Sequence, residues 1–206
     1  MSSDTTILYV ADPMCSWCWG FAPTVRALRE IAPETPVRIV LGGLAPDSSA
    51  PMEGAMRDYV QQAWHDVAQH CRVDFNFDFW EQCQPRRSTY IACRAVIVAR
   101  SYNLESSMFD AIQRAYYQEA RNPSDLEILA DVAEQLDIPK PDFFAAMQAQ
   151  ETQDALESDF QTRRSLGVQS FPSLGVLHQG KPQLLHSGWC SPSNVQKIWR
   201  LWNDNA

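Results

Sequence analysis

Apolar residues recur at two different periods along the chain. Runs of apolar and β-branched residues at 6–10 and 36–41 predict two buried strands. Between them, apolar positions recur at helical spacing, so we expect one helix that begins near Cys18 and ends before Pro33. Strand, helix and strand in this order predict a βαβ unit with parallel strands.

The middle of the chain, from about residue 51 to 150, has a different pattern. Its apolar residues follow the three-to-four spacing of helices, and no segment there predicts a strand. Ser124, with Glu127 three residues later, matches a capping box, so we expect Ser124 to be the N-cap of one of these helices.

The last quarter of the chain returns to mixed helix and strand. The pattern predicts a helix at 152–166, a strand near 174–177 and a returning strand at 183–186, joined by a hairpin turn. A final amphipathic helix opens at Ser191, where a proline follows in the first turn. The ends of the chain are therefore α/β, and the helical block separates them.

Length and charge limit the classes of protein to consider. The 206 residues form one large domain, or a small domain with an insertion. The net charge of −8 argues against a nucleic-acid-binding surface, and there is no basic membrane-surface segment. No stretch reaches the roughly 18–20 apolar residues of a transmembrane helix, and residues 1–6 do not match a secretory signal. We therefore expect a cytoplasmic protein with no nucleic-acid or membrane partner.

Two of the six cysteines form the motif with the clearest chemistry, Cys15-Ser16-Trp17-Cys18. It follows the first predicted strand and opens the predicted helix, a context typical of a thioredoxin-like redox motif. Two intervening residues bring both sulfurs onto one helical turn, and the N–H groups at a helix start favour the thiolate. We expect Cys15 to be the exposed nucleophile and Cys18 the more buried thiol that resolves the mixed disulfide.

A second signal is Ser170-Phe171-Pro172, directly before the strand and hairpin of the last quarter. In the second half of a thioredoxin fold a cis-proline at this place faces the active disulfide, so we expect Pro172 to be cis. The backbone of Ser170 and Phe171 is expected to hold a substrate chain as an added strand. We also expect Trp17 to line the substrate groove and Trp19 to pack under the helix.

Two segments together resemble the DsbA-like thioredoxin superfamily, and within it the FrnE-like branch of predicted protein-disulfide isomerases. They are Asp12-Pro13-Met14-Cys15-Ser16-Trp17-Cys18-Trp19-Gly20-Phe21 and Val168-Gln169-Ser170-Phe171-Pro172-Ser173-Leu174. The resemblance covers nearly the whole chain. It implies an α/β, thioredoxin-like fold with an inserted all-helical domain: a discontinuous core of residues 1–48 and 151–206, and an insertion of residues 49–150.

The resemblance also implies disulfide exchange, with Cys15, Cys18 and Pro172 at the matching positions. Many relatives have glycine where Ser170 stands, and DsbA itself has Pro-His between its cysteines where this chain has Ser-Trp. With a cytoplasmic location we expect a thiol–disulfide oxidoreductase or protein-disulfide isomerase that works towards reduction or isomerisation. Its substrates would be protein or low-molecular-weight thiols and disulfides, glutathione among them, with no cofactor.

Three other interpretations stay open. A zinc site needs about four ligands, and without a second CxxC the further candidates are Cys71, with the preceding histidine, and Cys83. A glutathione-dependent enzyme similar to kappa-class transferases or hydroxychromene carboxylate isomerases typically has serine at the position of Cys15 and does not need Cys18. A non-catalytic binding or chaperone module would use neither thiol.

The remaining polar and sulfur-containing candidates have simpler interpretations. Cys71, Cys83, Cys93 and Cys190 are expected to be structural, because a free cysteine behaves as a small hydrophobe. Cys93 lies in an apolar run and is expected in the core, and Cys190 is the first candidate for a second redox thiol. Asp12 either caps a turn or relays a proton to a cysteine.

Overall fold

The structure is a computed structural model that describes residues 5–205. The amino-terminal residues 1–4, to which part of the secretory-signal interpretation refers, and residue 206 lie outside the described residues. The elements in chain order are β1 (Thr5–Ala11), α1 (Ser16–Trp19), α2 (Ala22–Ile31), β2 (Val37–Leu41), α3 (Gly54–Cys71), α4 (Phe79–Gln82), α5 (Tyr90–Arg100), α6 (Glu105–Tyr117), α7 (Leu126–Glu134), α8 (Lys140–Gln148), α9 (Gln150–Ser165), β3 (Ser173–His178), β4 (Lys181–Ser187) and α10 (Pro192–Asn203).

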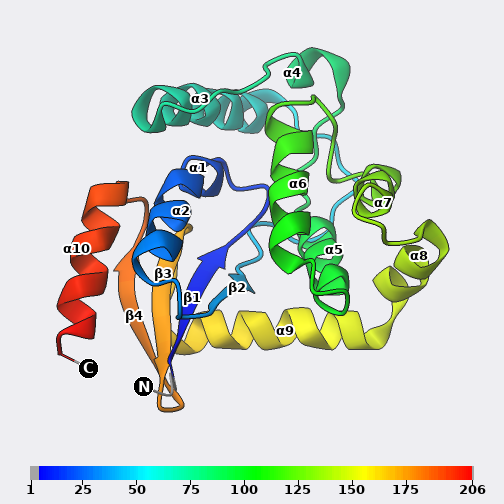
Figure 1. The fold of residues 1–206 in the computed structure, drawn as a ribbon. Coiled ribbons are helices and arrows are strands. Elements are labelled where there is room, and N and C mark those ends of the chain that lie inside the picture. The colour runs from blue at the N-terminus through cyan, green and yellow to red at the C-terminus, as the bar shows by residue number, and fades with distance from the viewer. Residues whose placement is uncertain (1–4, 206) are drawn as a thin grey trace.

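The strands form one sheet in the order β2-β1-β3-β4 (Figure 1). β1 is parallel to β2 and antiparallel to β3, so Ile7 lies between Val37 and Val176. β3 and β4 are the two arms of a hairpin. The predicted βαβ unit and the predicted hairpin are both confirmed.

Both faces of the sheet are buried at the central strand β1, whereas the edge strand β4 is largely exposed. Side chains alternate along a strand, so β1 contributes one row to each face. Ile7 and Tyr9 belong to the large core that also contains residues of α2 and α6, whereas Leu8 and Val10 pack in a smaller cluster with Leu166, at the end of α9. α10 packs beside α2 and completes the layer of helices over the sheet (Figure 1).

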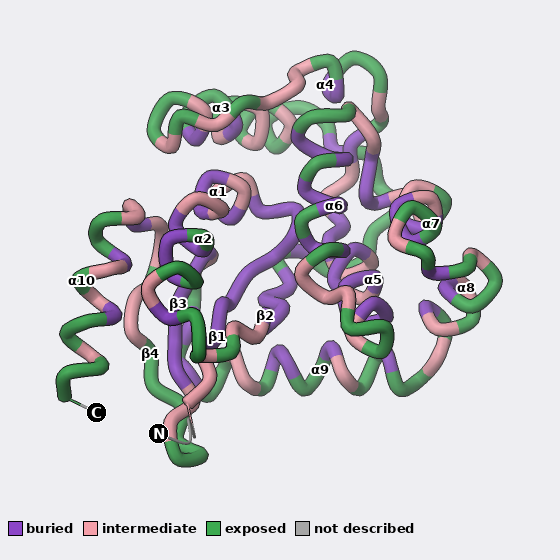
Figure 2. The backbone as a smooth tube through the Cα atoms, viewed as in Figure 1, coloured by how far each residue is buried: buried purple, intermediate pink, exposed green. Residues whose placement is uncertain are grey.

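The segment from α3 to α8 is entirely helical apart from its connecting loops, as the pattern predicts. α5 lies at its centre and is buried on nearly every side, which fits an apolar helix with helices all round it (Figure 2). α3 crosses above α1 at the top of the view in Figure 1 and contacts it. The chain therefore has an α/β, thioredoxin-like fold with a helical insertion. The insertion's boundaries at residues 49 and 150 stay a prediction.

The single helix expected after Cys18 is wrong in detail, because the chain forms α1 and α2 with a break between them. Pro23 lies in the first turn of α2. Proline has no N–H to donate to the preceding turn and is tolerated only where that N–H would be unpaired. The break leaves the two cysteines on a separate short helix.

The N-cap expected at Ser124 is also wrong. Asp125 precedes the first helical residue of α7, and its side chain makes no capping hydrogen bond. The Ser124 hydroxyl is drawn into the interior, where it donates to the Ser88 carbonyl oxygen at 3.0 Å. A buried hydroxyl needs a hydrogen-bond partner. Here the partner is a carbonyl oxygen far away in the sequence, in place of a backbone N–H in the first turn of α7.

Candidate active site

The two cysteines of the motif lie at the end of the loop that follows β1. Cys15 has extended backbone geometry and precedes α1, and Cys18 lies within that helix. The Cys15 carbonyl oxygen accepts the N–H of Cys18 at 2.9 Å and that of Trp19 at 3.1 Å, so one helical turn joins the two residues. Cys15 is 7% exposed and Cys18 is fully buried, and both are free thiols. Of the pair, only Cys15 borders the groove described below.

The environment of Cys18 favours its neutral thiol. Burial raises the pKa of Cys18 well above its ordinary value, and the neighbouring Cys15 sulfur raises it further, against a backbone hydrogen bond from Asp12 that lowers it. A thiol held neutral is a poor first nucleophile, because the thiolate is the reactive form. Cys15, which was expected to be exposed, is itself buried, although Cys18 is the more buried of the two, as expected. Which thiol attacks first stays a prediction.

The loop before β3 faces the motif from the other side. The Phe171–Pro172 peptide bond is cis, as expected. The Cys15 Sγ lies 3.8 Å from the Phe171 carbonyl oxygen. Within residues 5–205 the N–H groups of Ser170 and Phe171 have no backbone partner, while the Pro172 carbonyl oxygen accepts the N–H of Gly188. Two backbone N–H groups without a backbone partner thus lie in the loop beside the sulfur.

A groove of about 280 Å³ surrounds Cys15. Its lining comes from three parts of the chain that are far apart in sequence: the motif with Trp17, the cis-proline loop with Ser170 and Phe171, and the inserted helices. The insertion contributes residues that the sequence analysis did not single out, among them Tyr59 of α3, Tyr116 of α6 and Arg87 in the loop before α5. Tyr59 is 67% exposed, although it lies in an apolar stripe. That exposure was not visible in the pattern, which shows only that one side of α3 is apolar.

The two tryptophans of the motif point to different places. Trp17 is half-buried, lines the groove, and its ring packs edge-on against His70 of α3 with centroids 5.6 Å apart. Trp19 stacks on Tyr117 with centroids 5.7 Å apart, and its indole N–H donates to the Asp74 carbonyl oxygen at 3.1 Å. Trp17 therefore borders the groove and Trp19 packs on Tyr117, while a role of Trp17 in substrate binding stays a prediction.

Asp12 is a fully buried carboxylate beneath the motif. It accepts hydrogen bonds from the N–H groups of Met14 and Leu44 at 2.8 and 2.7 Å and from the Thr89 hydroxyl at 2.7 Å. Burial raises the pKa of Asp12, and these three hydrogen bonds oppose the shift. The side chain ties the active-site loop to the loop after β2 and to the start of α5. Of the two roles considered, these contacts are those of a capping residue.

Comparison with known protein families agrees with this geometry. The profile of the DSBA-like thioredoxin domain matches residues 6–196. The chain belongs to this family. The DSBA-like family comprises thiol–disulfide oxidoreductases, and the match extends over the sheet, both cysteines, the cis-proline loop and the helical insertion.

Solved structures show that other DSBA-like proteins share the whole fold. A candidate protein disulfide isomerase from Nitrosomonas europaea is 29% identical, with a TM-score of 0.86 over 98% of each chain. The cytosolic disulfide reductase DsbM from Pseudomonas aeruginosa is 23% identical, with a TM-score of 0.80 over 98% of this chain and 100% of that one. At the latter identity the similarity shows the fold alone.

A curated relative is longer than this chain. The ClpXP adapter protein SpxH from Bacillus subtilis is 23% identical over 172 residues, which are 82% of this chain. The match spans only 56% of SpxH. The shared part is therefore about half of that protein.

The other cysteines of this DSBA-like chain are embedded in its packing. Cys93 is fully buried in the core, as expected. Its sulfur lies 3.6 Å from the Asp12 carboxylate. Burial raises the pKa of Cys71 and of Cys190 to about 11, which disfavours the reactive thiolate of both. No group of three or more His, Cys, Asp or Glu side chains among the described residues is placed to hold a metal ion, and no described helix is long and apolar enough to cross a membrane.

Proposed function

We propose that the chain is a thiol–disulfide oxidoreductase in which Cys15 is the nucleophile and Cys18 the resolving thiol of the Cys-Ser-Trp-Cys motif. The observation that supports this most directly is the asymmetry of the pair. Cys15 borders a groove beside two backbone N–H groups that have no backbone partner, whereas Cys18 is fully buried and has a raised pKa. Trp17 and the Ser170–Phe171–Pro172 loop would hold the substrate segment beside the sulfur.

The reaction proceeds in two exchanges that conserve electrons. The Cys15 thiolate attacks one sulfur of a substrate disulfide, which forms a mixed disulfide and releases the other substrate sulfur as a thiolate. Cys18 then loses its proton and attacks the Cys15 sulfur, so that the Cys15–Cys18 disulfide forms and the second substrate sulfur leaves. Two electrons pass from the cysteine pair to the substrate. A low-molecular-weight thiol such as glutathione would return them by the reverse exchanges.

We propose protein or low-molecular-weight disulfides as the substrates, and reduction or isomerisation in the cytoplasm as the direction. One DsbM structure from Pseudomonas aeruginosa contains glutathione. The groove of about 280 Å³ is bordered by Arg87, whose guanidinium suits a carboxylate of such a thiol, whereas the neighbouring Arg86 is already paired with Asp125. The inserted helices, proposed to span residues 49–150, would select the substrate because they form one wall of this groove.

Mutation of each cysteine tests the assignment. Cys18→Ser, incubated with a disulfide-containing peptide, should accumulate a mixed disulfide at Cys15 that mass spectrometry detects, and Cys15→Ser should form none. Cys93→Ser is the matched control and should turn over like the wild-type protein. Near-normal turnover by Cys18→Ser would instead favour the kappa-class type of glutathione chemistry. If neither the wild-type protein nor any variant turns over disulfides, but a partner still binds, a non-catalytic binding module would be favoured.

The reduction potential decides the direction. A titration of the pair in glutathione buffers, read by alkylation and mass spectrometry, should give a poise near that of thioredoxin, about −270 mV. A poise near that of DsbA, about −120 mV, would make the protein an oxidant and contradict the proposed direction.

A further inference from the structure

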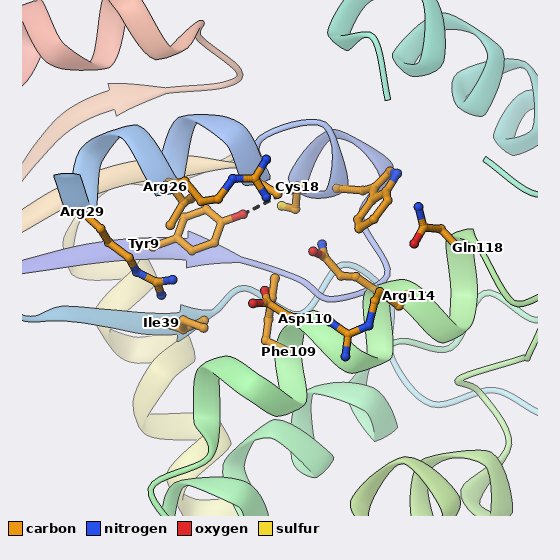
Figure 3. Close-up of a pocket in the computed structure, with 13 residues that line it drawn as sticks. Tyr9, Cys18, Arg26, Arg29, Ile39, Phe109, Asp110, Arg114 and Gln118 are labelled. Carbon is orange, nitrogen blue, oxygen red and sulfur yellow. Dashed lines mark hydrogen bonds between the residues drawn. The ribbon is translucent and has the colours of Figure 1, made fainter. Parts of the chain in front are cut away.

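A second cavity of about 310 Å³ lies on the Cys18 side of the motif. Its walls come from α2 and α6, and its floor from β1 and Cys18. It shares no lining residue with the groove at Cys15. Figure 3 shows side chains of α2 on one side of the hollow and side chains of α6 on the other, with Tyr9 and Cys18 at its inner end. Its volume is at the lower end of the range of small-molecule sites.

The floor of this cavity presents an unused hydrogen-bond donor. Gln113 is 2% exposed, and its Nε2 has no hydrogen-bond partner. Beside it, the Tyr9 hydroxyl makes one long hydrogen bond, 3.5 Å, to the Cys18 carbonyl oxygen. A buried amide without a partner is unfavourable, so nearly all such groups in folded proteins are paired. An oxygen acceptor in the cavity would satisfy Gln113 and could also accept from Tyr9.

The rim of the cavity is positively charged. Arg26 and Arg29 of α2 and Arg114 of α6 border it, with Asp110 as the one carboxylate (Figure 3). All three guanidinium groups lower the pKa of Asp110, although burial raises it more. Within the described residues none of the three forms an ion pair with Asp110 or with any other carboxylate. Two positive charges at the rim are therefore left without compensation, in a protein whose net charge is −8.

We propose that this cavity is a binding site for a small dicarboxylate anion. The rim provides two uncompensated positive charges, and guanidinium groups bind carboxylates by paired hydrogen bonds. The floor provides the Gln113 and Tyr9 donors for an oxygen at the inner end of the ligand. The occupant lies against Cys18, on residues other than those of the proposed redox groove. Binding can therefore be measured whether or not the protein exchanges disulfides.

Calorimetric titration with glutarate, and with butyrate as the monocarboxylate of similar length, tests the proposal. Glutarate should bind saturably and about tenfold more tightly than butyrate. Arg114→Ala and Gln113→Leu should each weaken glutarate binding about fivefold to tenfold. Arg200→Ala removes an exposed arginine of α10 that does not line the cavity, and should stay within twofold of the wild-type protein.

The position of the ligand has its own readout. Trp19 lines the cavity, so its indole N–H resonance, assigned with Trp19→Phe, should shift on addition of glutarate. The indole resonance of Trp202, which lies in α10 and donates to Gln183, should not shift. Absence of saturable glutarate binding would overturn the proposal. Unchanged binding by Arg114→Ala, whose exposed side chain the fold does not need, would overturn it as well. A redox-inactive protein that still binds glutarate would refute only the proposed function.

Discussion

Asp159 of α9 is a buried carboxylate that joins three elements. It accepts the N–H of Leu41, at the end of β2, at 2.9 Å. It also forms ion pairs with Arg38 of β2 at 2.8 Å and with Arg100 of α5 at 2.5 Å. The Asp159 side chain is fully buried, whereas Arg38 is 42% and Arg100 25% exposed. The carboxylate thus links the sheet edge, the central helix of the insertion and the helix that returns the chain to the sheet.

Removal of this carboxylate should destabilise the fold strongly. Breaking a buried ion pair from one side costs about 3–5 kcal/mol, because the partner charge stays behind without compensation. Here water can reach part of both arginines, so we expect about 3 kcal/mol for Asp159→Ala, with the unpaired Leu41 N–H contributing roughly 1 kcal/mol of it. For a chain of this size each kcal/mol lowers Tm by about 2–4 °C, so the expected fall is about 6–12 °C.

Urea unfolding and thermal melting of Asp159→Ala measure this loss. Glu157→Ala is the matched control, because Glu157 lies on the same helix and pairs with Arg164 at the surface, where both side chains are about half exposed. The control should stay within about 0.5 kcal/mol of the wild-type protein. A loss below about 1 kcal/mol in Asp159→Ala would refute the reasoning, since it would mean that the partners find water or other acceptors without cost.

Two further predictions concern the active-site loops. A Cβ at Gly42 would lie 2.2 Å from the ring of Phe171. Gly42→Ala should therefore displace the cis-proline loop and lower kcat/KM for disulfide reduction at least about tenfold; a rate within twofold of wild type would contradict this. Folding raises the pKa of Asp12 above its ordinary value of 3.8, so the contribution of Asp12 to stability falls as pH rises from that value through the raised pKa. In Asp12→Asn the free energy of unfolding at pH 7 minus that at pH 4 should be larger than in the wild-type protein, and a smaller difference would contradict the argument.

The order of the elements and the position of the two-cysteine motif could be predicted from the sequence. Both follow from local signals. Apolar runs of strand length and apolar repeats of helical spacing predicted the sheet segments and the helical block, because burial selects residues at the period of each element. The cysteine spacing predicted that the two cysteines lie together, since two residues between cysteines bring both onto one turn. The place of Pro172 in a thioredoxin fold predicted the cis bond, and the resemblance to DsbA-like proteins predicted that the helical block is an insertion.

Details that depend on one local residue were less reliable. The capping pattern at Ser124 and the helical repeat after Cys18 were both genuine local signals. In each case another interaction or residue prevented the structure that the signal predicted. The Ser124 hydroxyl donates to the Ser88 carbonyl oxygen, which is distant in sequence, and therefore does not cap the helix. Pro23, whose missing N–H the pattern did not weigh, divided the expected helix in two.

The sequence by itself determined that a closely spaced pair of cysteines stands after a buried strand, because that information lies in neighbouring residues. The tertiary structure alone decided what surrounds each sulfur. Tyr59 forms a wall of the groove at Cys15, and Gln113 faces the cavity at Cys18, because of how α3 and α6 pack over α1 and α2. The spacing within a helix defines which of its sides is apolar. Which partner that side meets is a property of the assembled fold, since it arises from contacts between residues far apart in the chain.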